Sequence, residues 1–418
     1  MKFFTAVWVV LCLSQLLIAQ QKPAPPKSVT VPLVIDHNRV IIDVEVAAQN
    51  GTTQRVHAWV DNGDPDLLIS RKMTNLAGLG GACGAQTCTA TPPKQIMIGG
   101  MQISFDGVTE ANVPIGPGAN PPLADGLDAD ITIPSTVLRH YDILIDYPGR
   151  KFTIGAPGSI HFLGTEAKVQ INPENGLIQV PSKIANKKYN LALDLGSSIS
   201  FLSEDLFSTL AAAHQDWPRM TGAVGSASMW GANEETKWQV MRIDRVQFGP
   251  LFLTDVPMVS LPKPTVDFFQ KRAAMSTVGL IAASVLQNYR VGLDYKRSTV
   301  YFDIGRLFNF PDFDVIGLFL RPESDGRYTI LGIADFDGKP SVPTGPDGVQ
   351  EGDILVAIND IPVQGSTMGQ VWSSLGGTPG QQRKLTIERA GKQFAVSATV
   401  QHFLAASTSE DEKKRKKK

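Results

Sequence analysis

The chain has 418 residues, of which 43% are hydrophobic, and its formal net charge at pH 7 is −1. A chain of this length is expected to form two or three domains, and the hydrophobic fraction is that of a soluble protein with apolar cores. The near-neutral charge gives no indication of nucleic-acid binding, and none is expected. The 38 glycines and 28 prolines favour a turn-rich, mainly β structure.

The first 20 residues have the organisation of a secretory signal peptide. Lys2 is followed by an apolar run over residues 3–18 and then by Ala19 and Gln20. This run is too short and too weakly flanked for a membrane anchor, so the mature protein is expected to be secreted or periplasmic, with no membrane span. A lipoprotein signal at Cys12 is the alternative, although Leu11 is larger than the small residue that such processing requires.

Two cysteines, Cys83 and Cys88, remain after removal of this segment and lie in a glycine-rich stretch. In an oxidising compartment, a local disulfide is the prediction. The alternatives are a pair of free thiols and a metal site. Two thiols do not complete the four ligands of zinc, and no histidine is near them in the sequence.

The mature chain begins with a predicted hairpin over residues 31–46, with its turn at Asp36-His37-Asn38, and a strand from Gln54 to Val60 follows. Short helices are predicted over residues 70–79 and 134–140, and strands over 95–105 and 142–154. A similar plan starts again near residue 164, with strands over 178–181 and 189–193. It continues with a helix over 206–217 and a flexible loop over 222–231.

The chain contains an internal repeat. Residues 58–70, AWVDNGDPDLLIS, match residues 191–203, LALDLGSSISFLS, with an Asp-x-Gly turn after an apolar strand in each copy. Further along, residues 137–155 align without a gap with residues 285–303, at an offset of 148 residues. A period this long indicates duplication of a lobe rather than a solenoid.

These motifs resemble the retropepsin-like aspartic peptidases, and two copies in one chain resemble the pepsin-type arrangement. The resemblance covers roughly residues 31–305 and implies a pair of β-barrel lobes that each supply one catalytic aspartate, here Asp61 and Asp194. Two carboxyl groups about 3 Å apart share one proton, so one acts as general base on a water while the other polarises the peptide carbonyl.

The neighbours of the aspartates are the predicted supporting residues. Gly63 and Gly196 lack a Cβ and let the two turns approach closely. Asn62 stands where the family has Thr or Ser, and its amide can still donate and accept, whereas Leu195 in the second copy cannot. Ser197 is expected to hydrogen-bond an aspartate oxygen. Other departures from the family are Asp64, where a small residue is usual, and the segments Leu280-Ile281-Ala282 and Gly126-Leu127-Asp128.

The last part of the chain resembles a PDZ domain. The resemblance rests on residues 351–359, EGDILVAIN, a predicted helix over residues 368–375 and two closing strands. In that family a loop binds the carboxylate of a peptide C-terminus while the peptide adds a strand to the sheet. The candidate here is Gly317-Leu318-Phe319-Leu320, and the alternative is that these residues form a core strand. Residues 405–418 end in KKRKKK and are expected to be a solvated tail.

The sequence therefore predicts an exported, monomeric aspartic endopeptidase that cleaves polypeptides and binds peptide C-termini, without metal or cofactor. The alternatives are a catalytically inactive peptide-binding protein on the same scaffold and a scaffold that works through the PDZ domain alone. Calcium binding by DNGDPD at residues 61–66 is disfavoured, because the twelfth position of such a loop is Lys72. The predicted boundaries are 1–20 (signal peptide), 21–30 (linker), 31–160 (lobe 1), 161–307 (lobe 2), 308–404 (PDZ domain) and 405–418 (tail).

Overall fold

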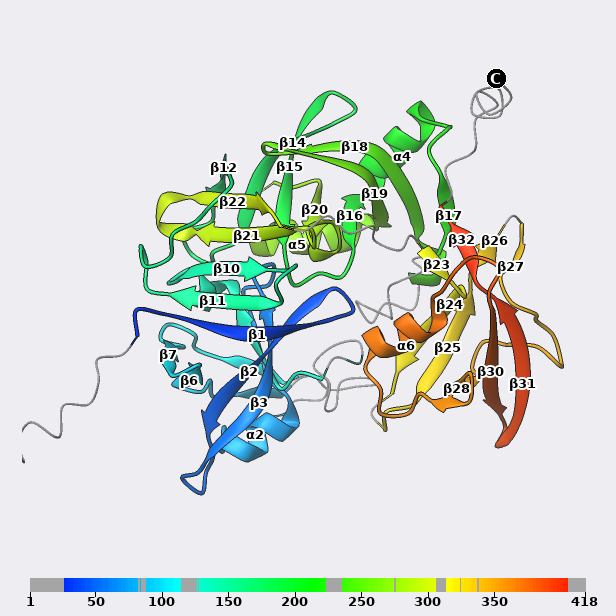
Figure 1. Ribbon diagram of the computed structural model, residues 1–418, viewed down its shortest axis with the longest axis horizontal. Helices are drawn as coiled ribbons and strands as arrows, with labels where there is room; N and C mark the ends of the chain where they lie inside the picture. Colours follow the sequence, from blue (N-terminus) through cyan, green and yellow to red (C-terminus); the bar gives the residue numbers. More distant parts are fainter. Residues whose placement is uncertain are drawn as a thin grey trace, which may run out of the picture.

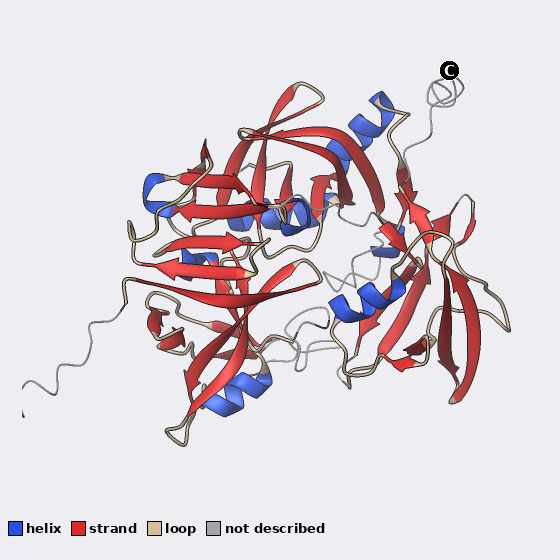
Figure 2. Ribbon diagram, in the orientation of Figure 1, coloured by secondary structure: helices blue, strands red, loops and turns tan. Residues whose placement is uncertain are grey.

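The structure is a computed structural model that describes residues 26–404 apart from 82, 84–87, 114–125, 127, 223–234, 274–275, 306–312, 324 and 337. The predicted signal peptide, the basic tail and most of the loop predicted at 222–231 lie outside the described residues. The mainly β prediction is confirmed (Figure 2). No helix among the described residues is both long and apolar enough to span a membrane.

The first lobe, residues 28–155, is built on long strands whose apolar side chains point to one face. In β2, for example, Val44 and Val46 are buried while Asp43 and Glu45 are exposed. Its elements are β1 (Ser28–Asp36), β2 (Arg39–Ala47), β3 (Thr53–Asp61), β4 (Leu67–Leu68), α2 (Arg71–Ala77), β5 (Cys88–Ala90), β6 (Gln95–Ile98), β7 (Met101–Ser104), β8 (Ala111–Val113), β9 (Ile131–Pro134), α3 (Ser135–Leu138), β10 (Asp142–Asp146) and β11 (Lys151–Gly155).

The second lobe, residues 165–304, repeats the pairing of the first. In the first lobe β3 pairs in parallel with β9 and β4 with β8; in the second, β15 pairs in parallel with β20 and β16 with β19. Its elements are β12 (Thr165–Lys168), β13 (Gln170–Ile171), β14 (Ile178–Ile184), β15 (Lys187–Asp194), β16 (Ser200–Ser203), α4 (Glu204–Ala213), β17 (Arg219–Thr221), η1 (Glu235–Lys237), β18 (Gln239–Phe248), β19 (Leu251–Leu261), α5 (Lys263–Ala273), β20 (Gly279–Ala282), η2 (Ala283–Val285), β21 (Tyr289–Asp294), η3 (Tyr295–Arg297) and β22 (Thr299–Ile304).

The two lobes are joined by a continuous sheet and a common core (Figure 1). Strand β10 of the first lobe pairs antiparallel with β21 of the second, and Leu144 lies opposite Gly292. These residues are separated by the 148-residue offset of the repeat. Equivalent residues that pair antiparallel are related by a local two-fold axis, so the repeat in the sequence is a repeat in space.

The C-terminal unit, residues 313–404, has its own core around Leu320, Ile330, Leu355 and Val371. Helix α6 begins with a capping box, in which Thr367 and Gln370 satisfy each other's backbone N–H groups. The elements are β23 (Phe313–Val315), β24 (Leu318–Pro322), β25 (Tyr328–Ile333), β26 (Asp335–Phe336), β27 (Lys339–Pro340), β28 (Ile354–Ile358), β29 (Ile361–Pro362), α6 (Met368–Leu375), β30 (Gln382–Arg389), β31 (Lys392–Thr399) and β32 (Gln401–Phe403).

The C-terminal unit packs against both lobes (Figure 1). Its Phe319 and Phe403 belong to the same apolar cluster as Phe201, Leu261 and Val266 of the second lobe. On the first lobe, the turn between β1 and β2 reaches α6, because the carboxylate of Asp36 accepts the backbone N–H of Gly369 at 2.8 Å. This unit is therefore in contact with the β1–β2 turn of the first lobe and with β16 and β19 of the second.

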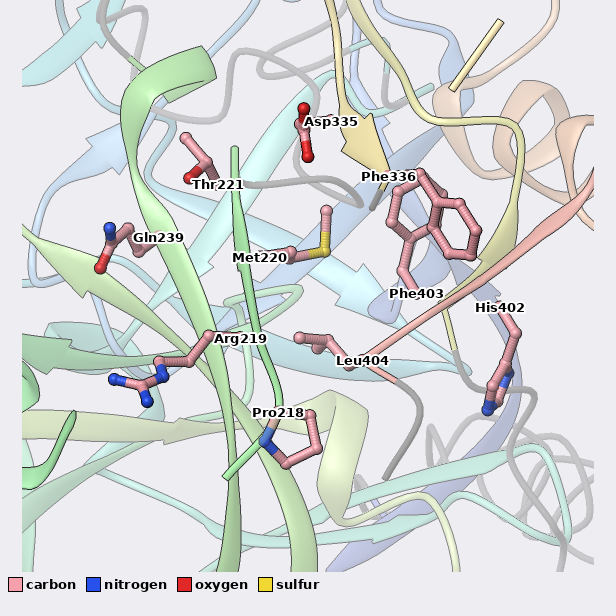
Figure 3. Close-up of a pocket in the computed structure, with 10 residues that line it drawn as sticks. All are labelled: Pro218, Arg219, Met220, Thr221, Gln239, Asp335, Phe336, His402, Phe403 and Leu404. Atoms are coloured by element: carbon pink, nitrogen blue, oxygen red, sulfur yellow. The ribbon is translucent and has the colours of Figure 1, made fainter. Parts of the chain in front are cut away.

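A cavity of about 520 Å³ lies along the junction with the second lobe, between β17 on one side and β26 and β32 on the other (Figure 3). Met220, Phe403 and Leu404 line it and are largely buried, whereas Arg219 and Asp335 are exposed. The Arg219 guanidinium donates to the carbonyls of Ala211 and Gln215, so it is engaged by its own lobe.

Candidate active site

Asp61 and Asp194 occupy equivalent positions in the two lobes, each at the end of a strand that is paired in parallel with a neighbour. The Oδ1 atom of Asp61 accepts the backbone N–H groups of Gly63 at 2.9 Å and Asp64 at 3.2 Å. The Oδ1 atom of Asp194 accepts those of Gly196 at 2.9 Å and Ser197 at 2.8 Å. Because the N–H groups hold one oxygen of each carboxyl, the orientation of both side chains is fixed by the backbone.

The two turns meet face to face, and each glycine lies against the carboxyl of the other lobe. A Cβ atom built on Gly63 would lie 2.1 Å from Cγ of Asp194, and one built on Gly196 would lie 2.4 Å from Cγ of Asp61. Both distances are far below van der Waals contact. The structure thus brings the four residues Asp61, Gly63, Asp194 and Gly196 into one cluster, and the close approach requires glycine at both positions.

Replacing Gly196 by Ala is therefore expected to push the two carboxyls apart and to lower any activity of the pair by about 100-fold or more. Gly80→Ala is the matched control, because a Cβ atom at Gly80 would meet no atom within 4 Å. The measurement is kcat/KM on a polypeptide substrate. Equal activity in the two variants would contradict the proposed function of this cluster.

Asn62 ties the two lobes together. Its Nδ2 donates to the carbonyl of Leu193 at 2.8 Å, and its Oδ1 accepts the N–H of Leu195 at 2.7 Å. The side chain is 1% exposed. One amide thus makes both the donated and the accepted bond across the interface, and the apolar side chain of Leu195 is buried at the equivalent position of the other lobe.

Ser197 differs from the expectation in one respect. Its backbone N–H bonds Asp194, but its hydroxyl donates to the carbonyl of Ile199 at 3.0 Å rather than to an aspartate oxygen. The side chain therefore stabilises the turn, and the backbone supplies the contact with the carboxyl.

The two carboxyls are almost completely buried, with 5% of Asp61 and 8% of Asp194 exposed. Burial, the largest cause, raises the pKa of Asp194 to about 6. Burial also raises the pKa of Asp61 well above its usual value of 3.8, with further increases from the negative charges of Asp194 and Asp64. Because the two carboxyls are close together and buried, they titrate jointly, and the pair retains a proton to higher pH than free carboxyls do.

Sequence reasoning missed the turn at residues 36–39 as part of the site. The Nε of Arg39 donates to the carbonyl of Gly196 at 3.3 Å, and the Nδ2 of Asn38 donates to the carbonyl of Ser198 at 2.9 Å. Arg39 is 2% exposed. The sequence did contain a signal for Arg39, because this charged residue directly precedes the apolar residues 40–42 in the run RVII.

The space beside Asp194 is small. A cavity of about 70 Å³ is lined by Gly63, Asp194 and apolar residues that include Phe201, Leu261 and Val266. Such a volume holds a few water molecules, whereas pockets for drug-sized ligands have about 300–1,000 Å³. Among the described residues, this cavity therefore reaches Asp194 but is too small for a drug-sized ligand.

The predicted carboxylate-binding stretch lies mostly in a strand. Leu318–Pro322 form β24, at the edge of the sheet, and the side chains of Leu318 and Leu320 enter the core of the C-terminal unit. The N–H of Leu318 already donates to the carbonyl of Ile316 at 2.8 Å. Phe319 packs toward the second lobe instead, close to Gly222. Leu318, Phe319 and Leu320 therefore form the core strand that was the alternative interpretation, and carboxylate binding by this stretch stays a prediction.

The two other kinds of site considered in the sequence were a disulfide and a metal site. Cys83 lies in the segment between α2 and β5, and it forms a disulfide with Cys88, the first residue of β5. Within the described parts of the chain, no group of three or more His, Cys, Asp or Glu side chains is arranged to hold a metal ion.

Comparisons with known proteins add the following. No protein-family model matches the chain, and no curated protein matches its sequence. Among solved structures, the chain is similar to an aspartic proteinase from Irpex lacteus, with 12% sequence identity and a TM-score of 0.36. The similarity covers 66% of this chain and 97% of that chain.

Proposed function

We propose that this protein is an aspartic-type endopeptidase in which Asp61 and Asp194 activate a water molecule. One observation carries the proposal: each Asp-x-Gly turn places its glycine directly against the carboxyl of the other lobe. Turns formed by chance have no reason to meet reciprocally across a two-fold axis. The buried pair also has the electrostatic asymmetry that acid–base catalysis needs.

The chemistry follows from the protonation of the pair. The ionised Asp194 takes a proton from a water molecule held between the carboxyls, and the protonated Asp61 donates a hydrogen bond to the carbonyl oxygen of the peptide. The hydroxide equivalent adds to the carbonyl carbon. The proton that Asp194 took from the water then passes to the amide nitrogen, the C–N bond breaks, and the amine product leaves. Because the carboxyls are held by backbone N–H groups, the geometry is set before the substrate arrives.

The C-terminal unit is proposed to act as a PDZ-type module. β24 lies at a sheet edge, and an extended peptide can add to such an edge as a further strand. Together with the apolar run at residues 3–18, this gives an exported endopeptidase that captures polypeptide C-termini.

The rival function is peptide binding without cleavage, and the observation that favours it is the third carboxyl, Asp64. Burial raises the pKa of both aspartates, and the negative charge of Asp64 raises the pKa of both further. The deciding experiment is incubation of the mature protein with an unfolded polypeptide between pH 4 and pH 8. Cleavage that is blocked by a pepstatin-like inhibitor and lost in Asp61→Asn and Asp194→Asn, but retained in the exposed control Asp106→Asn, supports the peptidase. Binding of the polypeptide without cleavage supports the rival.

A further inference from the structure

Arg39 is a buried cation beside the aspartate pair. Only 2% of the residue is exposed, its Nε donates to the carbonyl of Gly196 at 3.3 Å, and its guanidinium carbon lies 5.3 Å from the centre of the Trp59 ring. The Nη1 atom is 3.5 Å from Nδ1 of His37. The guanidinium is therefore held in place by a carbonyl of the second lobe and by side chains of the first.

A buried cation destabilises the folded protein unless neighbouring groups compensate its charge. Removing a charged group from water is unfavourable by several kcal/mol, and buried charges are retained where opposite charges compensate them. The charged or titratable groups around Arg39 and the pair are Asp36, His37, Asp61, Asp64, Tyr147 and Asp194. Of these, Asp194 belongs to the turn that Arg39 contacts directly, through the Gly196 carbonyl.

The effect on the pair is asymmetric. Burial and the negative charge of Asp64 raise the pKa of Asp194, and the backbone N–H groups of its turn lower it; the positive charge of Arg39 lowers it further. The pKa of Asp61 is raised by burial and by the negative charges of Asp194 and Asp64. The hydroxyl of Tyr147, in the turn after β10, also responds to Asp194, because the charge of Asp194 adds to burial in raising its pKa. The two carboxyls are equivalent by sequence repeat, but in the described part of the chain the hydrogen bond of Arg39 goes to the turn of Asp194.

We propose that Arg39 is a positioning residue that fixes the Asp194 turn against the first lobe and assigns the negative charge of the pair to Asp194, leaving the shared proton on Asp61. The inference rests on the proposed function, because it names the direction in which that pair works. It distinguishes the general base from the general acid, which the two-fold repeat alone does not.

The test is the pH dependence of Arg39→Met and Arg39→Lys in the full mature chain. In Arg39→Met, the acidic limb of kcat/KM is expected to move to higher pH by about one unit, because an opposite charge nearby lowers a carboxyl pKa by about 1–3 units. In Arg39→Lys, which keeps the charge, the limb is expected to stay close to that of the unsubstituted protein. A residue with a purely structural role would lower activity at all pH values without moving the limb.

A second readout does not depend on activity. The titration of the Asp194 carboxyl is followed by ¹³C NMR, with its signal assigned by its loss in Asp194→Asn, and the same upward shift is expected in Arg39→Met. Arg242→Met is the matched control, because Arg242 is also buried, 8% exposed, but donates to the carbonyl of Leu404 away from the pair. An unchanged Asp194 titration in Arg39→Met, or an equal shift in Arg242→Met, would overturn the inference. Absence of cleavage with the expected NMR shift would reject the peptidase and retain the role of Arg39.

Discussion

Asp194→Asn is expected to abolish peptide hydrolysis and, at the same time, to make the folded protein more stable at pH 7. Catalysis falls by about 1,000-fold or more, because the amide cannot accept a proton from water. Stability rises because burial raises the pKa of the Asp194 carboxyl from 3.8 to about 6. At about 1.36 kcal/mol per pKa unit, the ionised carboxylate lowers the free energy of unfolding by about 3 kcal/mol.

The sign of this effect depends on pH. Between pH 4 and pH 6 the unfolded chain has lost the Asp194 proton while the folded protein still binds it, so the free energy of unfolding falls as the pH rises. The asparagine variant does not undergo this loss. Its advantage is therefore expected to be small at pH 4 and to reach about 3 kcal/mol at pH 7, as measured by urea unfolding. Its Oδ1 can still accept the N–H groups of Gly196 and Ser197, so no bond to the turn is lost.

Asp106→Asn is the exposed control. It is expected to leave hydrolysis unchanged and to change the free energy of unfolding by no more than about 0.5 kcal/mol, as for most surface substitutions. A loss of stability in Asp194→Asn at pH 7 would show that the carboxylate is stabilised where it lies. That result would contradict a strained pair that shares one proton, and with it the proposed mechanism.

The local features of the candidate site could be predicted from the sequence. The alignment of Asp61 with Asp194 identified the two turns, and the 148-residue offset identified the repeat, whose equivalent residues Leu144 and Gly292 pair in the structure. Helix α6 spans the range that was predicted for it. These features are encoded by residues close together in the chain or repeated in it, and for that reason pattern analysis finds them.

Features that depend on distant contacts were missed. Arg39 and Gly196 are 157 residues apart, and nothing in either segment indicates the other. Helix α5 was not predicted, although Pro264 in its first turn is compatible with a helix start, because its only large apolar residues are Val266, Phe268 and Phe269 and they give no sustained helical periodicity. The hydroxyl of Ser197 was assigned to an aspartate because its sequence position favours that, but the fold of the turn aims it at Ile199. The packing of the C-terminal unit on the lobes also has no local signal.

Asn62→Leu is expected to cost the protein both stability and activity. The substitution copies the residue that the second lobe has at the equivalent position, Leu195, and so makes the two turns alike. It leaves the carbonyl of Leu193 and the N–H of Leu195 without the partners they have at 2.8 and 2.7 Å, in an interface where the side chain is 1% exposed. Each buried polar group that loses its partner costs about 1–3 kcal/mol, so the free energy of unfolding should fall by about 3 kcal/mol.

Activity should fall by about 100-fold, because the amide is a direct bond between the two turns and small displacements of catalytic groups are costly. Urea unfolding and kcat/KM measure the two effects, and Asn190→Leu, an exposed position on the same strand as Leu193, is the control. If Asn62→Leu matched the control in both measurements, the two lobes would be held in register by their common sheet and core alone. The family's hydroxyl residue at this position would then have no counterpart here, and the close approach of the carboxyls would depend only on Gly63 and Gly196.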